Sequence, residues 1–176
     1  MLIRCLITTF LLLSLSSKAQ FYNLGQNPAS TKWSQIKTDY FQLIFPNDFQ
    51  DKAQDLANLL AYANEKSRLT LNTKPRKISI ILQNNTTVDN GFVTLAPKRS
   101  EFYATPSQEN DGVDWLKKLA VHEYRHVVQF EKYEEGVGKV LKIIFGEQGM
   151  GALIVLTTPL WMIEGDAVIV ESEHTE

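Results

Sequence analysis

Two histidines in one short segment are the residues of this sequence best suited to chemistry. The segment reads His122-Glu123-Tyr124-Arg125-His126. In a helix, residues four positions apart lie about one turn apart on the same face, so both imidazoles could reach a single ion. Zinc suits this pair because it accepts neutral imidazole nitrogens in a tetrahedral shell. Glu123 would project about 100° round the helix from His122, where its carboxylate could take a proton from a water molecule that zinc activates.

A third metal ligand is needed, and few residues can supply it. His174 is one candidate, but it lies near the end of the chain. Glu164 is the better one, because it directly follows an apolar run and is expected on the first turns of another helix. A carboxylate beside Trp161 and Ile163 makes sense if a cation neutralises it. The other interpretation is a glutamate near a helix N-terminus that interacts with the helix dipole.

Arg125 is the residue that most favours a different interpretation, in which the histidine segment is a polar patch on a solvated helix face. Uncharged residues usually occupy the two middle positions of an H-E-x-x-H motif. We expect the long side chain of Arg125 to extend outward from the helix flank, so that the motif tolerates it.

The sequence around both segments resembles the gluzincin metallopeptidases. In that family two motif histidines and a downstream glutamate, often in a W-x-x-E-G-x-A context, hold zinc. Here positions 161–167 read W-M-I-E-G-D-A, and Glu164 follows His126 by 38 residues. The resemblance covers roughly residues 77–171. The chain is similar in particular to secreted bacterial proteins whose peptidase-like N-terminal part precedes a β-propeller.

This resemblance implies a role for each matching residue. His122, His126 and Glu164 would ligate Zn²⁺, and Glu123 would be the general base and later the proton donor. Many gluzincins also carry an acid one helical turn after the ligand glutamate, where it orients a ligand histidine. This chain has Val168 there.

Two further matches to the family are less direct. Glu171 lies seven residues after Glu164 on the same helical face and could take the orienting role of the missing acid; the alternative is a solvated helix acid. Residues 100–105 match the family's edge strand, to which an extended peptide could pair through its backbone. Within that strand we expect Phe102 and Tyr103 to pack in the core.

The predicted fold is α+β and zincin-like: a small mixed sheet packs against the long H-E-x-x-H helix, and a following helical segment carries the third ligand. Alternation and helical spacing predict the elements, with Asp48 and Asp114 as N-caps of the two helices. Both helices are expected on one side of the sheet. Strands are predicted at residues 33–45, 77–82, 92–95 and 101–104, and helices at 49–71 and 114–132.

Residues 135–163, between the two metal-binding segments, contain five glycines and many aliphatic residues. The uncharged stretch there contains Pro159 and is shorter than the roughly 20 residues of a transmembrane helix. A buried helical hairpin that returns Glu164 to the histidines is therefore favoured, and contact with a membrane surface is the alternative.

Composition sets the class of protein. The chain has 176 residues, 44% of them hydrophobic, which is typical of a folded domain. Acidic residues outnumber basic ones by 20 to 18, so no positive charge supports nucleic-acid binding. A single cysteine excludes an internal disulfide framework and a cysteine-rich metal site.

The N-terminus has the features of a signal peptide. Arg4 precedes an apolar run from Cys5 to Leu15, and Ser17 and Ala19 fit the signal-peptidase pattern. Residues 1–19 are therefore predicted to be cleaved, which places the protein in the periplasm or outside the cell; an uncleaved anchor is the alternative. Residues 20–176 would form a peptidase-like domain, truncated on its C-terminal side and followed by further domains of a longer chain.

The sequence thus predicts a secreted zinc-dependent peptidase that acts on peptides or proteins, with no nucleic-acid partner and no membrane contact beyond the signal peptide. The alternative is a non-catalytic, zinc-stabilised, peptidase-like binding or scaffold module of a larger exported protein.

Overall fold

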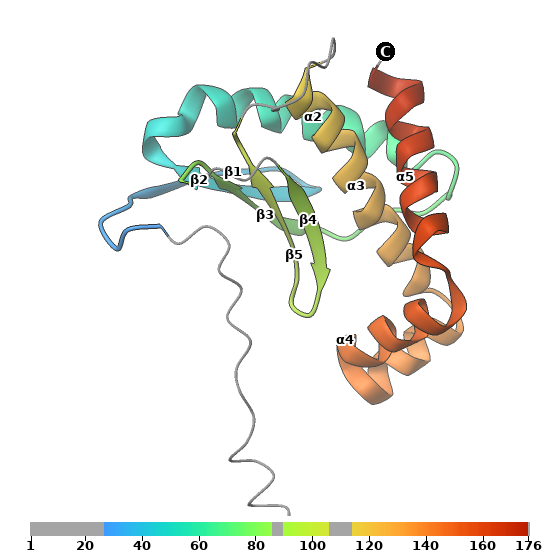
Figure 1. The fold of residues 1–176 in the computed structure, drawn as a ribbon. Helices are drawn as coiled ribbons and strands as arrows, with labels where there is room; N and C mark the ends of the chain where they lie inside the picture. The colour runs from blue at the N-terminus through green and yellow to red at the C-terminus, as the bar shows by residue number, and fades with distance from the viewer. Residues whose placement is uncertain (1–26, 86–89, 106–113, 176) are drawn as a thin grey trace, which may run out of the picture.

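The computed structural model describes residues 27–85, 90–105 and 114–175. The predicted signal peptide lies outside these residues. The elements follow the chain as strands, a helix, three strands and three helices (Figure 1). They are β1 (Trp33–Lys37), β2 (Phe41–Pro46), the short 3₁₀ helix η1 (Asn47–Phe49), α2 (Gln50–Ser67), β3 (Ile78–Gln83), β4 (Gly91–Leu95), β5 (Lys98–Tyr103), α3 (Trp115–Tyr133), α4 (Val137–Thr157) and α5 (Leu160–Thr175).

The five strands form one mixed sheet in the order β1-β2-β3-β5-β4. The central pairs β2–β3 and β3–β5 are parallel, and the outer pairs β1–β2 and β4–β5 are antiparallel. This mixed sheet with its helices confirms the α+β part of the predicted fold class.

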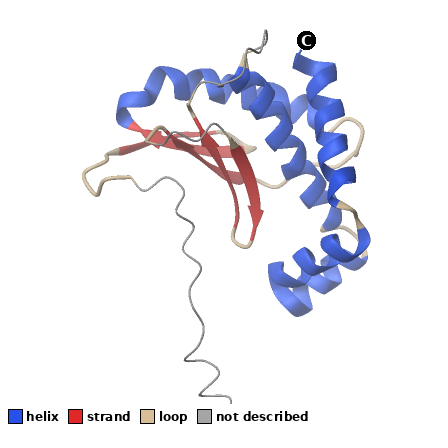
Figure 2. Ribbon diagram, viewed as in Figure 1, coloured by secondary structure: helices blue, strands red, loops and turns tan. Residues whose placement is uncertain are grey.

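Alternation along the strands sends one set of side chains into the core. Phe41, Leu43 and Phe45 of β2 are buried, as are Ile78 and Ile80 of β3. They pack against apolar residues of α2 and α3, and these two helices lie on the same side of the sheet (Figure 2). The predicted arrangement of sheet and helices is confirmed.

Two local predictions near the N-terminus are wrong. The segment predicted as one strand at residues 33–45 forms the hairpin of β1 and β2, because the hydroxyl oxygen of Thr38 accepts hydrogen bonds from the amides of Tyr40 and Phe41 and closes a turn. Asp48 lies inside η1 and does not cap α2, whose first residue follows Phe49 without a side-chain cap.

The cap predicted for the long helix is confirmed. The carboxylate of Asp114 accepts a hydrogen bond from the amide of Leu116 at 2.9 Å, which satisfies one of the free donors at the start of α3. This fixes where α3 begins and so sets the position of the histidine segment two turns further on.

The predicted edge strand lies in the interior of the sheet. The tight hairpin after β4 returns the chain as β5, which inserts between β4 and β3. The edge next to α3 is therefore β4. Phe102 and Tyr103 of β5 are both buried, as expected for packing residues.

The predicted buried hairpin is wrong in one respect. α4 and α5 return the chain to α3, but α4 is mostly exposed, and its buried residues are Gly138, Met150 and Ile154. By length and composition α4 could also cross a membrane. Its helix is interrupted at Gly146, whose φ of 68° is left-handed, so it consists of two shorter helical pieces.

Candidate metal centre

Three electron-pair donors converge where α3 meets α5. The Nε2 atoms of His122 and His126 lie 3.3 Å apart, one turn from each other on α3. Glu164, on the second turn of α5, places Oε2 at 3.4 Å from the first of these nitrogens and 3.5 Å from the second. These residues form the group that could hold a metal ion among the described parts of the chain.

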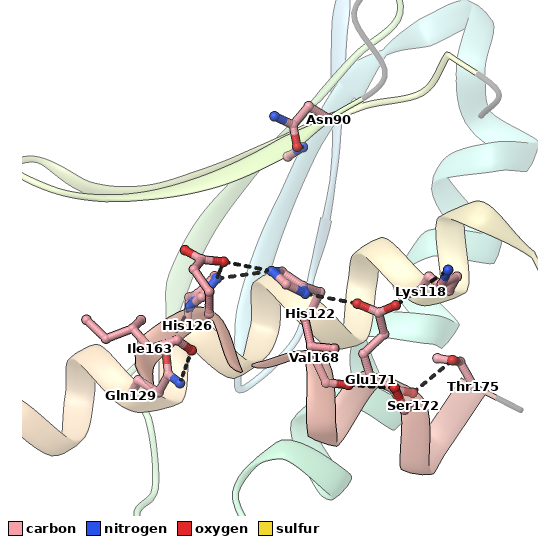
Figure 3. Close-up of polar contacts among 12 residues, drawn as sticks. Asn90, Lys118, His122, His126, Gln129, Ile163, Val168, Glu171, Ser172 and Thr175 are labelled. Carbon is pink, nitrogen blue, oxygen red and sulfur yellow. Dashed lines mark hydrogen bonds and ion pairs between the residues drawn. The ribbon is translucent and has the colours of Figure 1, made fainter. Parts of the chain in front are cut away.

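Hydrogen bonds behind the imidazoles fix which ring nitrogen carries the proton. The Nδ1 atom of His122 faces the carboxylate of Glu171 at 2.9 Å, and a carboxylate can only accept. The Nδ1 atom of His126 faces Oε1 of Gln129 at 2.8 Å (Figure 3). Both Nδ1 atoms therefore donate, and in the neutral form of each imidazole the Nε2 lone pair is free to bind a cation.

This donor set fits a metal cation. Two neutral nitrogens and a carboxylate oxygen at this separation repel one another unless a positive charge lies between them. A tetrahedral zinc shell with ligand bonds of about 2.0–2.1 Å has edges of about 3.3–3.4 Å. The separations of 3.3 and 3.4 Å lie within this range, and the third, 3.5 Å, is slightly longer. Burial also lowers the pKa of His126, which favours the neutral imidazole that binds metal.

Glu123 lies beside this cluster, and its carboxyl group is not one of the three converging donors. Its side chain is buried, with 5% of the residue exposed, and Oε2 has no hydrogen-bond partner. Burial, followed by the charge of Glu164, raises the pKa of Glu123 to about 8. The backbone of Gly91 makes room for it, because a Cβ at that position would lie 2.9 Å from Cγ of Glu123. A buried carboxyl group with one oxygen left without a hydrogen-bond partner is available for proton transfer.

A cavity of about 780 Å³ opens over the cluster. Its walls come from β4, α3, α4 and the start of α5, so the edge strand of the sheet and the three clustered residues line the same cavity. The lining is mainly apolar and includes Phe92, Phe130, Ile154 and Leu160. An extended segment lying along β4 would pass next to both Glu123 and the histidines.

Arg125 is buried and does not extend outward as predicted. Only 1% of the residue is exposed, and its guanidinium forms a two-point ion pair with Asp166 of α5, with N–O distances of 2.6 and 2.8 Å. Its remaining terminal nitrogen donates to the carbonyl of Ser67. Burial alone would raise the pKa of Asp166, but hydrogen bonds from Arg125 and Gln129 outweigh it and hold that pKa below its usual value.

The structure brings together all five residues predicted for the site. His122, His126 and Glu164 form the cluster, Glu123 flanks it, and Glu171 contacts His122. His174, the other candidate ligand, is not in the cluster; its carbonyl accepts a hydrogen bond from the hydroxyl of Tyr62.

Sequence reasoning missed the polar residues that link α3 to α5. Arg125 and Gln129 of α3 form these links with Asp166 of α5. One signal was available: a charged residue between two candidate ligands on a mostly buried helix requires a partner of opposite charge.

No protein-family model, no curated protein and no solved structure matches this chain. The similarity to gluzincins therefore rests on the two sequence segments alone.

Proposed function

We propose that this protein is a zinc-dependent peptidase, in which His122, His126 and Glu164 hold the ion and Glu123 is the general base. The observation that carries the proposal is the convergence of two imidazole nitrogens and a carboxylate oxygen at separations that suit zinc, beside the buried carboxyl group of Glu123, whose Oε2 has no hydrogen-bond partner. The cavity over these residues is bordered by an edge strand, which suits an extended polypeptide substrate.

When bound, zinc would polarise the scissile carbonyl and make water a stronger nucleophile. The other steps belong to the chain's own residues. Glu123 would accept the proton that the attacking water loses and deliver it to the leaving amine nitrogen. Glu171 and Gln129 hold the Nδ1 protons of the two histidines, so that the Nε2 lone pairs stay directed at the ion.

The second candidate function is a binding or scaffold module in which zinc is structural. It is favoured by the lining of the cavity: among the described residues there, none is a tyrosine, arginine or lysine, and Asn90 is the side-chain amide that could donate to an oxyanion. The predicted signal peptide would place either form of the protein outside the cytoplasm.

Metal analysis combined with a peptidase assay separates the two functions. The variants are Glu123→Gln and, as a matched control, Glu101→Gln, which alters another buried carboxylate away from the cavity. The proposal predicts one zinc ion per chain in all three proteins. It also predicts casein cleavage by the wild type and the control, and a loss of about 10²–10⁴-fold in Glu123→Gln.

Three results would contradict parts of this account. Stoichiometric zinc without cleavage of any peptide supports the binding module. Full activity in Glu123→Gln would show that Glu123 is not the general base. Absence of zinc from the wild-type protein rejects both functions.

A further inference from the structure

The side chain of Gln129 lies between His126 and the turn of α5 that carries Glu164. It is buried, with 6% of the residue exposed. Its Oε1 accepts from Nδ1 of His126 at 2.8 Å. Its Nε2 donates to the carbonyl of Ile163 at 2.9 Å and to the carboxylate of Asp166 at 2.6 Å. One amide group therefore contacts a histidine of the cluster and residues on both sides of Glu164, and Figure 3 shows it between His126 and Ile163.

The orientation of this amide is determined by its partners. A backbone carbonyl and a carboxylate only accept, so the amino group of Gln129 must face Ile163 and Asp166. The amide oxygen must then face His126, whose Nδ1 must carry the proton. Reversing the amide would place its oxygen against two acceptors and lose both hydrogen bonds to α5, so only one arrangement satisfies all three partners.

Arg125 also binds this turn of α5, through the carboxylate of Asp166. Its two-point contact with Asp166 leaves one carboxylate oxygen, Oδ2, shared between the guanidinium and the amino group of Gln129. α5 is thus fixed to α3 through Asp166, two residues from Glu164, by the buried side chains of Arg125 and Gln129. Glu164 itself is half exposed and forms no contact with Gln129, so its position depends on the turn that holds it.

We infer that Gln129 is a positioning residue that couples the second histidine to the third ligand. It fixes the proton on His126 and at the same time sets the distance between the α3 histidines and Glu164. This inference rests on the proposed metal site. Removing such an outer contact typically lowers metal affinity by about 10–100-fold, and we expect a loss in this range for Gln129.

The test compares two glutamines of equal burial in the full chain. Gln129→Met keeps the length of the side chain but removes its hydrogen bonds. Gln83→Met is the matched control, because Gln83 is also 6% exposed and hydrogen-bonded to polar side chains, but lies away from the cavity. Zinc affinity of each metal-free protein is measured by competition with a chromophoric chelator. The visible spectrum of the cobalt-loaded protein reports the coordination geometry.

The inference predicts that Gln129→Met binds zinc about 10–100-fold more weakly than the wild type and has an altered cobalt spectrum. Gln83→Met should match the wild type in both, even if its thermal stability falls. Gln129→Glu provides a second variant, since it keeps an oxygen toward His126 but places a carboxylate against Ile163 and Asp166. It should also weaken binding, whereas a residue that fixes only the histidine proton would leave it unchanged.

Wild-type affinity and spectrum in either Gln129 variant would overturn the inference while leaving the proposed metal site intact. A wild-type protein that binds no zinc would instead overturn the metal site, and this inference with it.

Discussion

Replacing Asp166 with alanine should destabilise the fold more than replacing Arg125 with methionine, although the two residues form one ion pair. The side chain of Arg125 is 1% exposed and that of Asp166 is 38% exposed. Without Asp166, the guanidinium stays in the interior with the carbonyl of Ser67 as its remaining partner. Breaking a buried pair in this way costs about 3–5 kcal/mol.

Replacing Arg125 with methionine leaves the carboxylate of Asp166, which water can reach and which still accepts a hydrogen bond from Gln129. The methionine fills the space of the arginine stem, so we expect a loss of about 1–2 kcal/mol, from the missing charge-assisted hydrogen bonds. For a domain of this size, about 2–4 °C is lost per kcal/mol. The melting temperature should therefore fall by roughly 6–20 °C in Asp166→Ala and by roughly 2–8 °C in Arg125→Met.

Urea unfolding followed by circular dichroism measures these losses. A chelator is kept in excess, because a metal that binds only the native state would add stability of its own. The double variant Arg125→Met/Asp166→Ala provides the sharpest test, since it contains no unpaired buried charge. It should be more stable than Asp166→Ala alone. A double variant that is equally or less stable, or a larger loss in Arg125→Met than in Asp166→Ala, would refute the reasoning.

Three further predictions concern other parts of the molecule. Gly91→Ala should lower peptidase turnover by about tenfold to 100-fold with zinc affinity unchanged, because its Cβ would displace Glu123; unchanged turnover in a steady-state assay would contradict this. Burial would raise the pKa of Glu131, but hydrogen bonds from Lys98 and a neighbouring arginine outweigh it and hold that pKa below 4.5. The ionised carboxylate therefore stabilises the fold at neutral pH. This stabilisation is lost as the pH falls from about 4.5 through the lowered pKa of Glu131. Glu131→Gln should be less stable at pH 7 and lose less stability on acidification, as measured by urea titrations at several pH values; parallel curves for the two proteins would reject this. Ile143→Asp on the exposed face of α4 should change the unfolding free energy by no more than about 0.5 kcal/mol, and a loss of several kcal/mol would mean that this face is covered.

The residues of the candidate metal cluster could be predicted because helical spacing or the coordination needs of zinc point to each of them. Helical spacing alone places His122 and His126 on one face of α3. Zinc needs a further ligand, and few residues could supply one, which made Glu164 the leading candidate. Glu171 followed from its position two turns along the same helix face.

The environment of Arg125 was not predictable in the same way. Its partner Asp166 lies 41 residues away, and the contact exists only because α5 packs against α3. Side-chain direction at a helix flank depends on the neighbouring element, which no local pattern specifies.

Strand order and helix exposure also depend on non-local packing. The sequence of β5 is compatible with either an edge or an interior strand, since propensity does not encode which strands pair. The apolar composition of α4 predicts burial, but burial depends on another element covering it. Among the described residues, α4 packs mainly against α3 and β4, so most of its apolar side chains remain exposed.

The most direct test of the central claim is a crystal structure of the zinc-loaded protein with anomalous diffraction measured at the zinc absorption edge. The account predicts one strong anomalous peak bonded to Nε2 of His122, Nε2 of His126 and a carboxylate oxygen of Glu164, at about 2.0–2.1 Å from each. No peak between these three atoms, or a zinc ion held by other residues, would contradict it.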